Sequence, residues 1–438
     1  MNLFATRRPV NRARATHRYR WRKEGNRFPR KAFDARPTGR YRRFLRRRQV
    51  RPPGPAGGSN GVCRYGFLAP LAIWIGYQAS AGARHRHDIL AHLPPIDLKE
   101  TMTYATSLNP FRLYNTRKVG PYFRREFERV GAGSPQIRIA YCNGGNPPRD
   151  VLIERRGQDL TLVLESVATR WFSRHMRYKV CAFAYWLSLS SSEVRQITVN
   201  ASDGEAVSNA RFAASVRFPQ HMGLPDPHFF QNDGFSSDLE RGRTAPRWDD
   251  RSGDIVWRGG MNGCGWASFS LEDIDNLAVL QRIRMVMRLR DMVGVDVRFV
   301  DLHGTTTGYG TLADQRNFLG KPLPAQNWLG YKFAIDIDGY TNTWSNLLIR
   351  MLYGCCVLKV GSQFGFRQWY YDELQPFEHY VPVAADMSDF AEKIEWVRSH
   401  DTEAKAIAER GQALARTLTF ASQARRAADL IEEHWDRR

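Results

Sequence analysis

Residues 331–360 constrain the fold of this chain more than any other stretch, and they read YKFAIDIDGYTNTWSNLLIRMLYGCCVLKV. An apolar strand over 331–338 breaks at a glycine, a helical pattern follows over 343–354, and a second apolar strand covers 355–360. A strand, a helix and a strand in this order form a parallel crossover unit, which is the building block of α/β sheets. The sequence therefore predicts a parallel α/β sheet in the second half of the chain.

The same alternation continues on both sides of this unit. In the second half, further strands are predicted at 254–260, 295–301 and 379–383, and helices at 273–292, 388–400 and 402–417. In the first half, strands are predicted at 137–142, 150–166 and 196–204, with a turn at Gly157, and a helix is predicted over 167–189. This rhythm is typical of α/β sheets with Rossmann-like winding.

The positive charge of the chain is concentrated at its N-terminal end. Residues 1–51 hold 19 Lys and Arg against two acids, whereas the remaining residues hold 46 basic against 42 acidic side chains. An Arg-rich segment with few apolar residues cannot bury a core, so we expect a disordered tail followed by a flexible linker that ends near residue 60. The tail either binds anionic lipid, lipopolysaccharide phosphates or RNA, or is a solvated, even non-native, leader. Because the rest is nearly neutral, nucleic acid is an unfavoured partner of the folded part.

Cysteine usage and apolar segments bear on the compartment. The six cysteines show no CxxC or Cys/His ligand spacing, so the sequence predicts neither a zinc site nor a disulfide framework. The apolar stretch 65–77 contains Pro70 and is short for a membrane span, which favours a surface or core helix. With no signal peptide evident, we expect a cytoplasmic protein that contacts the inner membrane peripherally through its basic tail.

Asp336 and Asp338 fall at the end of the central predicted strand, two residues apart and therefore on one face. Buried carboxylates need partners, and the carboxyl end of a parallel strand is where ligand crevices open. The pair either holds a divalent ion on a diphosphate, or one aspartate binds a sugar or ribose hydroxyl without metal, or both are structural. The pattern alone leaves these alternatives open.

Several blocks together resemble one known family. Besides residues 331–360, they are QWYYDELQPFEHYVPVAADMSDFAEKIEWV at 368–397 and EAKAIAERG at 403–411. Over about residues 254–420 the chain resembles glycosyltransferase family 90, the group of capsule-associated, lipopolysaccharide-modifying and protein O-glucosyltransferase proteins. The resemblance implies a GT-B-like α/β fold, with two Rossmann-like domains and a cleft between them. The expected parts are a tail over 1–60, an acceptor domain over 61–245, a nucleotide-sugar domain over 246–400 and C-terminal helices over 401–438.

The resemblance also implies an inverting transfer that needs no metal or other cofactor, and it indicates a catalytic base. In the family this base is an aspartate at a strand end, upstream of a proline- and aromatic-rich loop. Here ITVNASDGE, followed by the loop around 219–230, points to Asp203. The alternative is an ordinary turn aspartate that caps its own backbone.

For the donor, the resemblance indicates residues around the diphosphate. The predicted donor-binding residues are Arg258, Gly259, Asp338, Gly339, Ser345 and Arg350. Arg258 is the candidate partner of the diphosphate, and its alternative is a salt-bridged arginine at a strand end. The chain departs from the family at Leu347, where an arginine is common, and Arg350 is expected to reach in instead. Trp344 and Trp369 are expected to pack in the core, with stacking on a base or sugar as the alternative.

These residues predict a glycosyltransferase that moves a hexose or pentose from a nucleotide sugar, most simply a UDP-sugar, to a hydroxyl of a glycan or glycolipid acceptor. The lack of a signal and of a retention tetrapeptide favours a bacterial envelope glycan such as lipopolysaccharide or capsule. The alternative is a non-catalytic protein that binds a sugar nucleotide or an anionic polymer.

Overall fold

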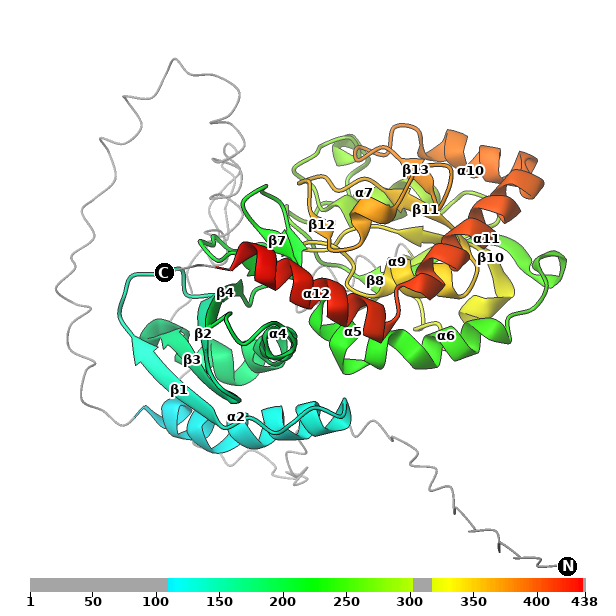
Figure 1. Ribbon diagram of the computed structural model, residues 1–438. Coiled ribbons are helices and arrows are strands. Elements are labelled where there is room, and N and C mark those ends of the chain that lie inside the picture. Colours follow the sequence, from blue (N-terminus) through cyan, green and yellow to red (C-terminus); the bar gives the residue numbers. More distant parts are fainter. Residues whose placement is uncertain (1–108, 302–316, 436–438) are drawn as a thin grey trace, which may run out of the picture. The chain divides into compact units, whose positions relative to one another are not determined.

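The structure, a computed structural model, describes residues 109–301 and 317–435. The Arg-rich tail, the linker and the apolar stretch 65–77 lie outside these residues. Within the described ranges the protein contains two larger α/β sheets and a two-stranded sheet formed by β6 (Ser215–Val216) and β12 (Arg367–Gln368) (Figure 1). The predicted α/β class is confirmed. No helix in these ranges is both long enough and apolar enough to cross a membrane.

The N-terminal sheet has the strand order β1-β3-β2-β4-β5-β7. Its strands are β1 (Ile137–Cys142), β2 (Asp150–Arg156), β3 (Asp159–Glu165), β4 (Gln196–Asn200), β5 (Phe212–Ala213) and β7 (Met222–Gly223). The β2–β3 hairpin turns at Gly157, whose φ of 60° suits glycine, as the sequence predicts. Because β2 runs antiparallel to both β3 and β4, this sheet is mixed, unlike an all-parallel Rossmann sheet.

Two helices pack on this sheet, α2 (Pro110–Arg129) and α4 (Arg177–Leu189). The stretch predicted as one helix over 167–189 is divided into a 3₁₀ turn (Ser166–Ala168), α3 (Thr169–Trp171), a π-helical turn (Phe172–Met176) and α4. The π-helical turn shifts the helical register just before α4, and such turns are frequent at functional sites.

The C-terminal sheet is parallel throughout, with the order β13-β11-β10-β8-β9. Its strands are β8 (Ser252–Gly260), β9 (Val295–Asp301), β10 (Tyr331–Asp336), β11 (Cys356–Val360) and β13 (Val381–Val383). Counted along the chain this is the doubly wound order 2-1-3-4-5, in which the winding reverses between β8 and β10. Ligands of such sheets bind beyond the carboxyl ends of the strands at that switch point.

The helices of this half are α7 (Gln281–Leu289), α9 (Asn346–Leu352), α10 (Phe390–Ser399), α11 (Asp401–Thr417) and α12 (Phe420–His434). Of the predicted helices, α7, α9 and α10 are shorter than the sequence suggests, whereas α11 matches its predicted range. The helix predicted from residue 273 begins only at Gln281, because residues 271–273 form a 3₁₀ turn and an irregular segment follows. Along the chain, α5 (Pro227–Gln231) and α6 (Ser236–Arg243) lie between the strands of the two sheets.

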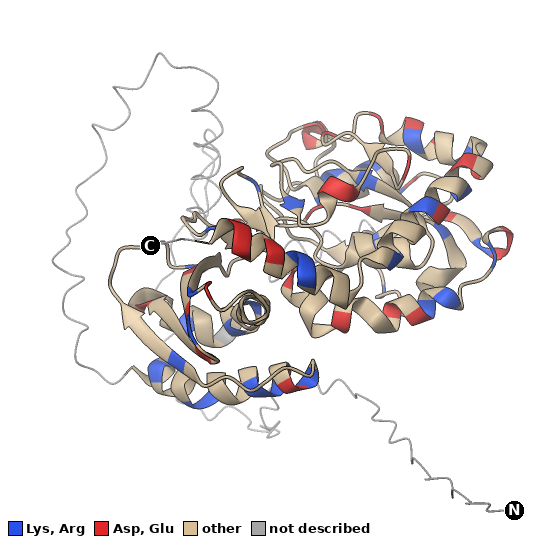
Figure 2. Ribbon diagram, in the orientation of Figure 1, with Lys and Arg blue, Asp and Glu red and all other residues tan. Residues whose placement is uncertain are grey.

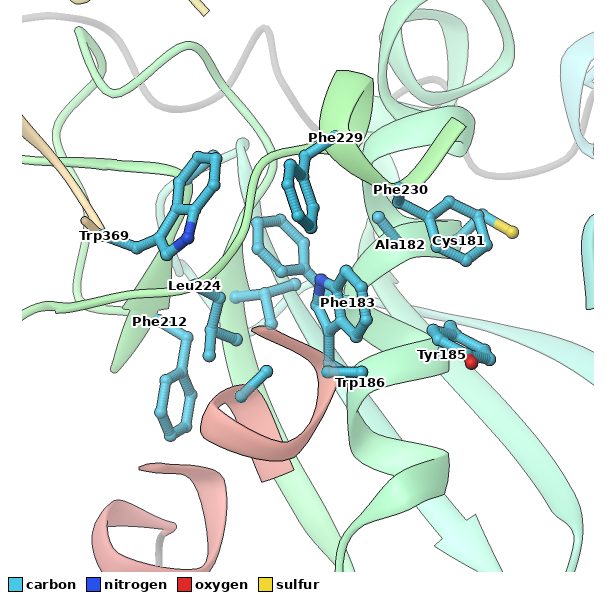
Figure 3. Close-up of a cluster of buried hydrophobic side chains, with 14 of the residues drawn as sticks. Cys181, Ala182, Phe183, Tyr185, Trp186, Phe212, Leu224, Phe229, Phe230 and Trp369 are labelled. Atoms are coloured by element: carbon cyan, nitrogen blue, oxygen red, sulfur yellow. The ribbon is translucent and has the colours of Figure 1, made fainter. Parts of the chain in front are cut away.

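Aromatic side chains from both halves of the sequence share one core. Phe229 of α5 contacts Trp369, with ring centroids 5.3 Å apart (Figure 3). The ring centroid of Phe420 of α12 lies 5.6 Å from that of Trp186 of α4. Trp369 is buried here, in agreement with the core-packing expectation. The last helix of the chain therefore packs on the N-terminal sheet's helix α4, as Figure 1 also shows.

Candidate functional site

A pocket of about 300 Å³ opens at the switch point of the C-terminal sheet. Its lining comes from the end of β8, from the segment between β10 and α9, and from the first half of the chain. The lining residues are Asp203, His228, Trp257, Arg258, Gly259, Asn262, Arg282 and residues 339–346. Residues far apart in sequence thus meet where a parallel sheet is expected to bind its ligand.

Asp203 enters this pocket from the turn that follows β4. The turn closes when Gly204 N donates to Ser202 Oγ at 2.9 Å, and Gly204 has a φ of 104°. A Cβ at Gly204 would lie 2.7 Å from the carbonyl oxygen of Ser215, so the turn requires glycine. Thr341 Oγ1 donates to the Asp203 carbonyl at 2.6 Å, which ties the turn to the segment after β10.

The Asp203 carboxylate is paired but not enclosed. Lys179 Nζ, from α4, donates to its Oδ1, and the Lys179 side chain is only 7% exposed. The Asp203 side chain is 35% exposed. The pair therefore leaves part of the carboxylate accessible from the pocket. This arrangement differs from the alternative, a turn aspartate whose carboxylate caps its own backbone.

Trp344 forms an aromatic wall next to this pair. Its ring centroid lies 5.3 Å from Lys179 Nζ and 5.4 Å from the His228 ring. Trp344 has a φ of 32°, which is unusual for a residue with a side chain, and its carbonyl accepts from Gln368 Nε2 at 2.8 Å. Strained backbone of this kind clusters at functional sites. Trp344 packs against the core and also lines the pocket, so core packing alone does not describe it.

Arg282 of α7 holds the carboxyl ends of β8 and β10 together. Its guanidinium donates to the carbonyls of Gly260 (3.0 Å), Ile337 (3.1 Å) and Asp338 (2.9 Å). Burial lowers the pKa of Arg282 to about 10, so this side chain stays charged at neutral pH. A fixed positive charge therefore lies in the wall of the pocket at the switch point.

Two glycines let side chains and backbone approach closely there. A Cβ at Gly259 would lie 2.4 Å from the indole ring of Trp257, and a Cβ at Gly339 would lie 2.8 Å from Asn262 Oδ1. Both glycines line the pocket, and donor binding by them stays a prediction.

For Asp336, the structure favours the structural role among the alternatives given for the two aspartates. It is fully buried, and its Oδ1 accepts from Thr343 Oγ1 and from Asn346 Nδ2 at 2.9 Å. Its Oδ2 accepts from Lys359 Nζ at 3.4 Å. These partners hold the segment between β10 and α9, as in the structural alternative.

Asp338 has a different environment, because β10 ends at Asp336 and the predicted shared strand face does not extend to it. Its Oδ1 accepts a long hydrogen bond from Asn342 Nδ2 at 3.4 Å, while Oδ2 is buried and makes no hydrogen bond within the described residues. Burial raises the pKa of Asp338 to about 6. The Lys359 charge and the Ser362 hydroxyl act in the opposite direction, but burial has the larger effect. Asp338 faces a smaller cavity beside the pocket, next to Cys264 and Gln281.

Of the other residues predicted to bind the donor, Arg258 and Arg350 are engaged by protein partners, whereas Ser345 lines the pocket. Arg258 is ion-paired with Asp296 and also donates to the Asp296 and Lys321 carbonyls at 2.8 and 3.2 Å, which matches its salt-bridge alternative. Ser345 precedes α9 and lines the pocket. Arg350 lies 3.5 Å from the Trp328 ring centroid and donates to Asn346, so the structure does not bring it to the pocket in place of an arginine at 347.

Sequence reasoning missed Lys179, His228, Asn262 and Arg282. One signal was present for His228, because Asp226 followed by Pro227 is a helix-start pattern, and Asp226 Oδ1 does accept from His228 N at 2.8 Å. Lys179 and Arg282 carried no local signal, since each looks like a charged residue on an ordinary helix.

Comparison with known proteins identifies part of the chain. The sequence model of glycosyl transferase family 90 matches residues 223–422, so the resemblance expected from the sequence is confirmed there. Protein O-glucosyltransferase 2 of Danio rerio is 30% identical over 177 residues, which are 40% of this chain and 31% of that protein. Protein O-glucosyltransferase 3 of Rattus norvegicus is 35% identical over 114 residues, 26% of this chain and 22% of that protein.

A viral protein matches the chain over a similar number of residues. Uncharacterized protein 179R of Invertebrate iridescent virus 6 is 30% identical over 178 residues, 37% of this chain and 15% of that protein. The chain thus spans less than a third of the length of each of these relatives. Asp203 and Lys179 lie before the region that the family model matches.

Solved structures show weaker similarity. Sucrose-phosphate synthase from Thermosynechococcus elongatus aligns with a TM-score of 0.36 and 11% identity over 71% of this chain and 91% of that chain. Anabaena Alr3699/HepE in complex with UDP and glucose aligns with a TM-score of 0.29 and 11% identity over 45% of this chain and 53% of that chain. Scores this low do not carry an argument about ligands or activity.

Proposed function

Because residues 223–422 match glycosyl transferase family 90, we propose that the protein is an inverting, metal-independent glycosyltransferase. It transfers a sugar from a UDP-sugar donor to a hydroxyl of an envelope glycan such as lipopolysaccharide or capsule. One observation carries the proposal: the pocket at the switch point joins an accessible carboxylate, Asp203, to a positively charged, glycine-lined wall.

In this proposal Asp203 is the general base. Its carboxylate accepts the proton of the acceptor hydroxyl while the hydroxyl oxygen forms a bond to the anomeric carbon. The bond from that carbon to the diphosphate oxygen breaks, and the nucleoside diphosphate leaves with the electron pair. Attack opposite the leaving group inverts the anomeric centre. Lys179 supports this role because it binds Oδ1 and leaves the rest of the carboxylate to the acceptor.

On the donor side, Arg282 and the two glycines support diphosphate binding. The guanidinium is held by three strand-end carbonyls, so its charge is fixed before any ligand arrives. Preorganised positive groups stabilise charge that develops on a leaving group. Gly259 and Gly339 let a ligand approach the backbone of β8 and of the segment after β10. The names of the zebrafish and rat relatives support glucose as the transferred sugar.

Metal independence is supported by the environment of Asp336. Its oxygens already accept from Lys359, Thr343 and Asn346, so this carboxylate is occupied by protein donors. We expect transfer to persist in excess chelator. A complete loss on chelation that Mn²⁺ restores would contradict this part of the proposal and revive the metal-pair interpretation.

A screen of nucleotide sugars by thermal shift, followed by a transfer assay, tests the proposal. A donor at 100 times its dissociation constant should stabilise the protein by about 2.7 kcal/mol. We expect UDP-glucose to stabilise it and the free UDP product to appear with a glycan acceptor. The second candidate, a non-catalytic sugar-nucleotide binder, is favoured by Leu347 and by the position of Arg350 away from the pocket. Binding of UDP-glucose without hydrolysis or transfer would support that candidate.

A further inference from the structure

We propose that the acceptor is an anionic saccharide, and that it binds to an arginine–aromatic face beside Asp203. This face consists of Arg112, Tyr114, Arg149, Arg170 and Trp171. The proposal rests on the proposed function, because it assigns the acceptor class of that same site.

The face begins at the edge of the N-terminal sheet that carries Asp203. Strands β1, β3 and β4 end at this edge and β2 begins there, because β2 is antiparallel to β3 and β4. Arg149 immediately precedes β2, and its carbonyl accepts from Ala201 N at 2.8 Å, two residues before Asp203. The Arg149 charge also interacts with the Asp203 and Glu205 carboxylates. An acceptor whose hydroxyl reaches Asp203 would therefore pass next to Arg149.

The arginines of the face are paired with aromatic side chains. The Arg149 guanidinium lies 3.6 Å from the Trp171 ring centroid, and Trp171 is 47% exposed. Arg112 lies 4.5 Å from the Tyr141 ring and donates to Ser166 Oγ at 2.9 Å, which fixes the start of α2 at the same edge. Tyr114 is 40% exposed, and its hydroxyl accepts from Arg177 Nη1 at 3.1 Å. Guanidinium groups held on ring faces keep N–H donors for bidentate contacts to carboxylates or phosphates.

The local charge points to an anion. Residues 110–125 contain five Lys and Arg and no acid, and residues 166–192 contain four Lys and Arg and no acid. The chain beyond residue 51 is otherwise nearly balanced, with 46 basic against 42 acidic residues in total. Figure 2 shows the same contrast, because the ribbon of the first part of α2 is coloured as basic without acidic residues, while α10, α11 and α12 carry both signs. Charge of one sign on a surface selects partners of the opposite sign.

An anionic bilayer is the competing occupant, since Leu113 and Val167 are also exposed on these elements. The position of Arg149 next to the turn that carries Asp203 favours a saccharide, because the acceptor of a glycosyl transfer must place a hydroxyl at Asp203. Exposed aromatic side chains with fixed neighbours also provide flat apolar surfaces on which sugar rings can lie.

Arginine footprinting of the full chain tests the proposal. The protein is treated with phenylglyoxal, with oligogalacturonate, maltoheptaose or phosphatidylglycerol vesicles present, and the modified arginines are quantified by mass spectrometry. At about ten times its dissociation constant, oligogalacturonate should slow modification of Arg149 and Arg170 about tenfold by mass action. Arg416 and Arg425, exposed on α11 and α12, are the internal controls and should not change.

Three outcomes would overturn the proposal. They are protection by the vesicles alone, equal protection by neutral maltoheptaose, and protection restricted to arginines of residues 1–51. The first would identify the face as a lipid-docking surface.

A charge-reversal variant separates this proposal from the proposed function. Arg112→Glu with Arg170→Glu changes two exposed side chains, and Arg416→Glu with Arg425→Glu is the matched control. We expect only the first variant to lose affinity for oligogalacturonate, by about tenfold or more, while both keep the thermal shift with UDP-glucose. Equal affinity of the two variants would contradict the anionic face. Absence of a thermal shift with UDP-glucose in the wild-type protein would instead contradict the proposed function.

Discussion

Each sheet carries a Lys–Asp pair near its carboxyl edge, and the two pairs differ in their surroundings. Among the described residues, Lys179 is the side-chain partner of Asp203, and the Asp203 side chain, which lines the pocket, is 35% exposed. Asp336 is fully buried and accepts from Lys359, Thr343 and Asn346. The same two residue types thus produce an available carboxylate in one sheet and a fixed support in the other. The comparison teaches that exposure and the number of donors, more than residue type, separate a reactive acid from a structural one.

The strongest test of the comparison is Asp203→Asn. Because an amide cannot accept the acceptor proton, we expect the transfer rate to fall by about 10³- to 10⁴-fold. The thermal shift with UDP-glucose should remain, since Arg282, Gly259 and Gly339, and not Asp203, are the groups proposed to bind the donor. Glu205→Gln, two residues away, is the matched control and should retain most of the activity. A Glu205 variant that loses activity while the Asp203 variant keeps it would reassign the base.

The corresponding change in the other pair should affect stability. Asp336→Asn removes the carboxylate that is ion-paired with the buried Lys359 ammonium, so we expect the free energy of unfolding to fall by about 3–5 kcal/mol. Urea denaturation measures this change. Asp372→Asn, which breaks an exposed pair with Arg367, should cost less than about 1 kcal/mol. Equal effects of the two variants would contradict the distinction between a structural and a surface pair.

Asp338 is a third case, a buried aspartate without a full set of partners, and it should make stability depend on pH. Its folded pKa of about 6 lies above the ordinary value of 3.8, so between these values the folded state binds more protons than the unfolded state. Stability therefore falls as pH rises through this window, by roughly 3 kcal/mol for a shift of about two units. Asp338→Asn removes the effect. The melting temperature of this variant should exceed that of the wild type by more at pH 7.5 than at pH 4.5, and a constant difference would contradict the shift.

The contact between Lys179 and Asp203 predicts a coupled effect on the rate. Lys179→Met should lower kcat by about 10- to 100-fold, because the carboxylate loses the partner that orients it. In the Asp203→Asn background the same change should have almost no further effect on kcat. Additive losses in kcat would show that Lys179 acts through the fold instead of through Asp203. The conservative variant Lys179→Arg should recover part of the activity.

The smallest expected effect concerns the glycine-lined wall. Gly259→Ala places a Cβ against the Trp257 indole, so we expect UDP-glucose affinity to fall about tenfold as the ring is displaced. Gly253→Ala on the same strand meets nothing within 4 Å and serves as control. Titration calorimetry measures both affinities. Unchanged binding by the Gly259 variant would remove this wall from the donor site.

The local patterns of the sequence predicted much of the fold. Alternating apolar strands and helices located the five strands of the C-terminal sheet, and Gly157 marked the β2–β3 turn. The Asp-Gly turn after β4 also placed Asp203 at a sheet edge. These features depend on neighbours within a few residues, which is why a single sequence contains them. The antiparallel direction of β2 and the late start of α7 depend on packing and were not apparent.

The sequence by itself determined the parallel sheet of residues 252–383, the turn that carries Asp203 and the family resemblance. Only the tertiary structure decided that Lys179 pairs with Asp203, that Arg282 joins the ends of β8 and β10, and that Asp336 and Asp338 have different environments. The physical reason is distance along the chain: Thr341 reaches the Asp203 carbonyl across 138 residues, and Arg282 reaches Asp338 across 56. Periodicity records which face of an element is buried, whereas a charged side chain finds its partner only once the sheets have packed.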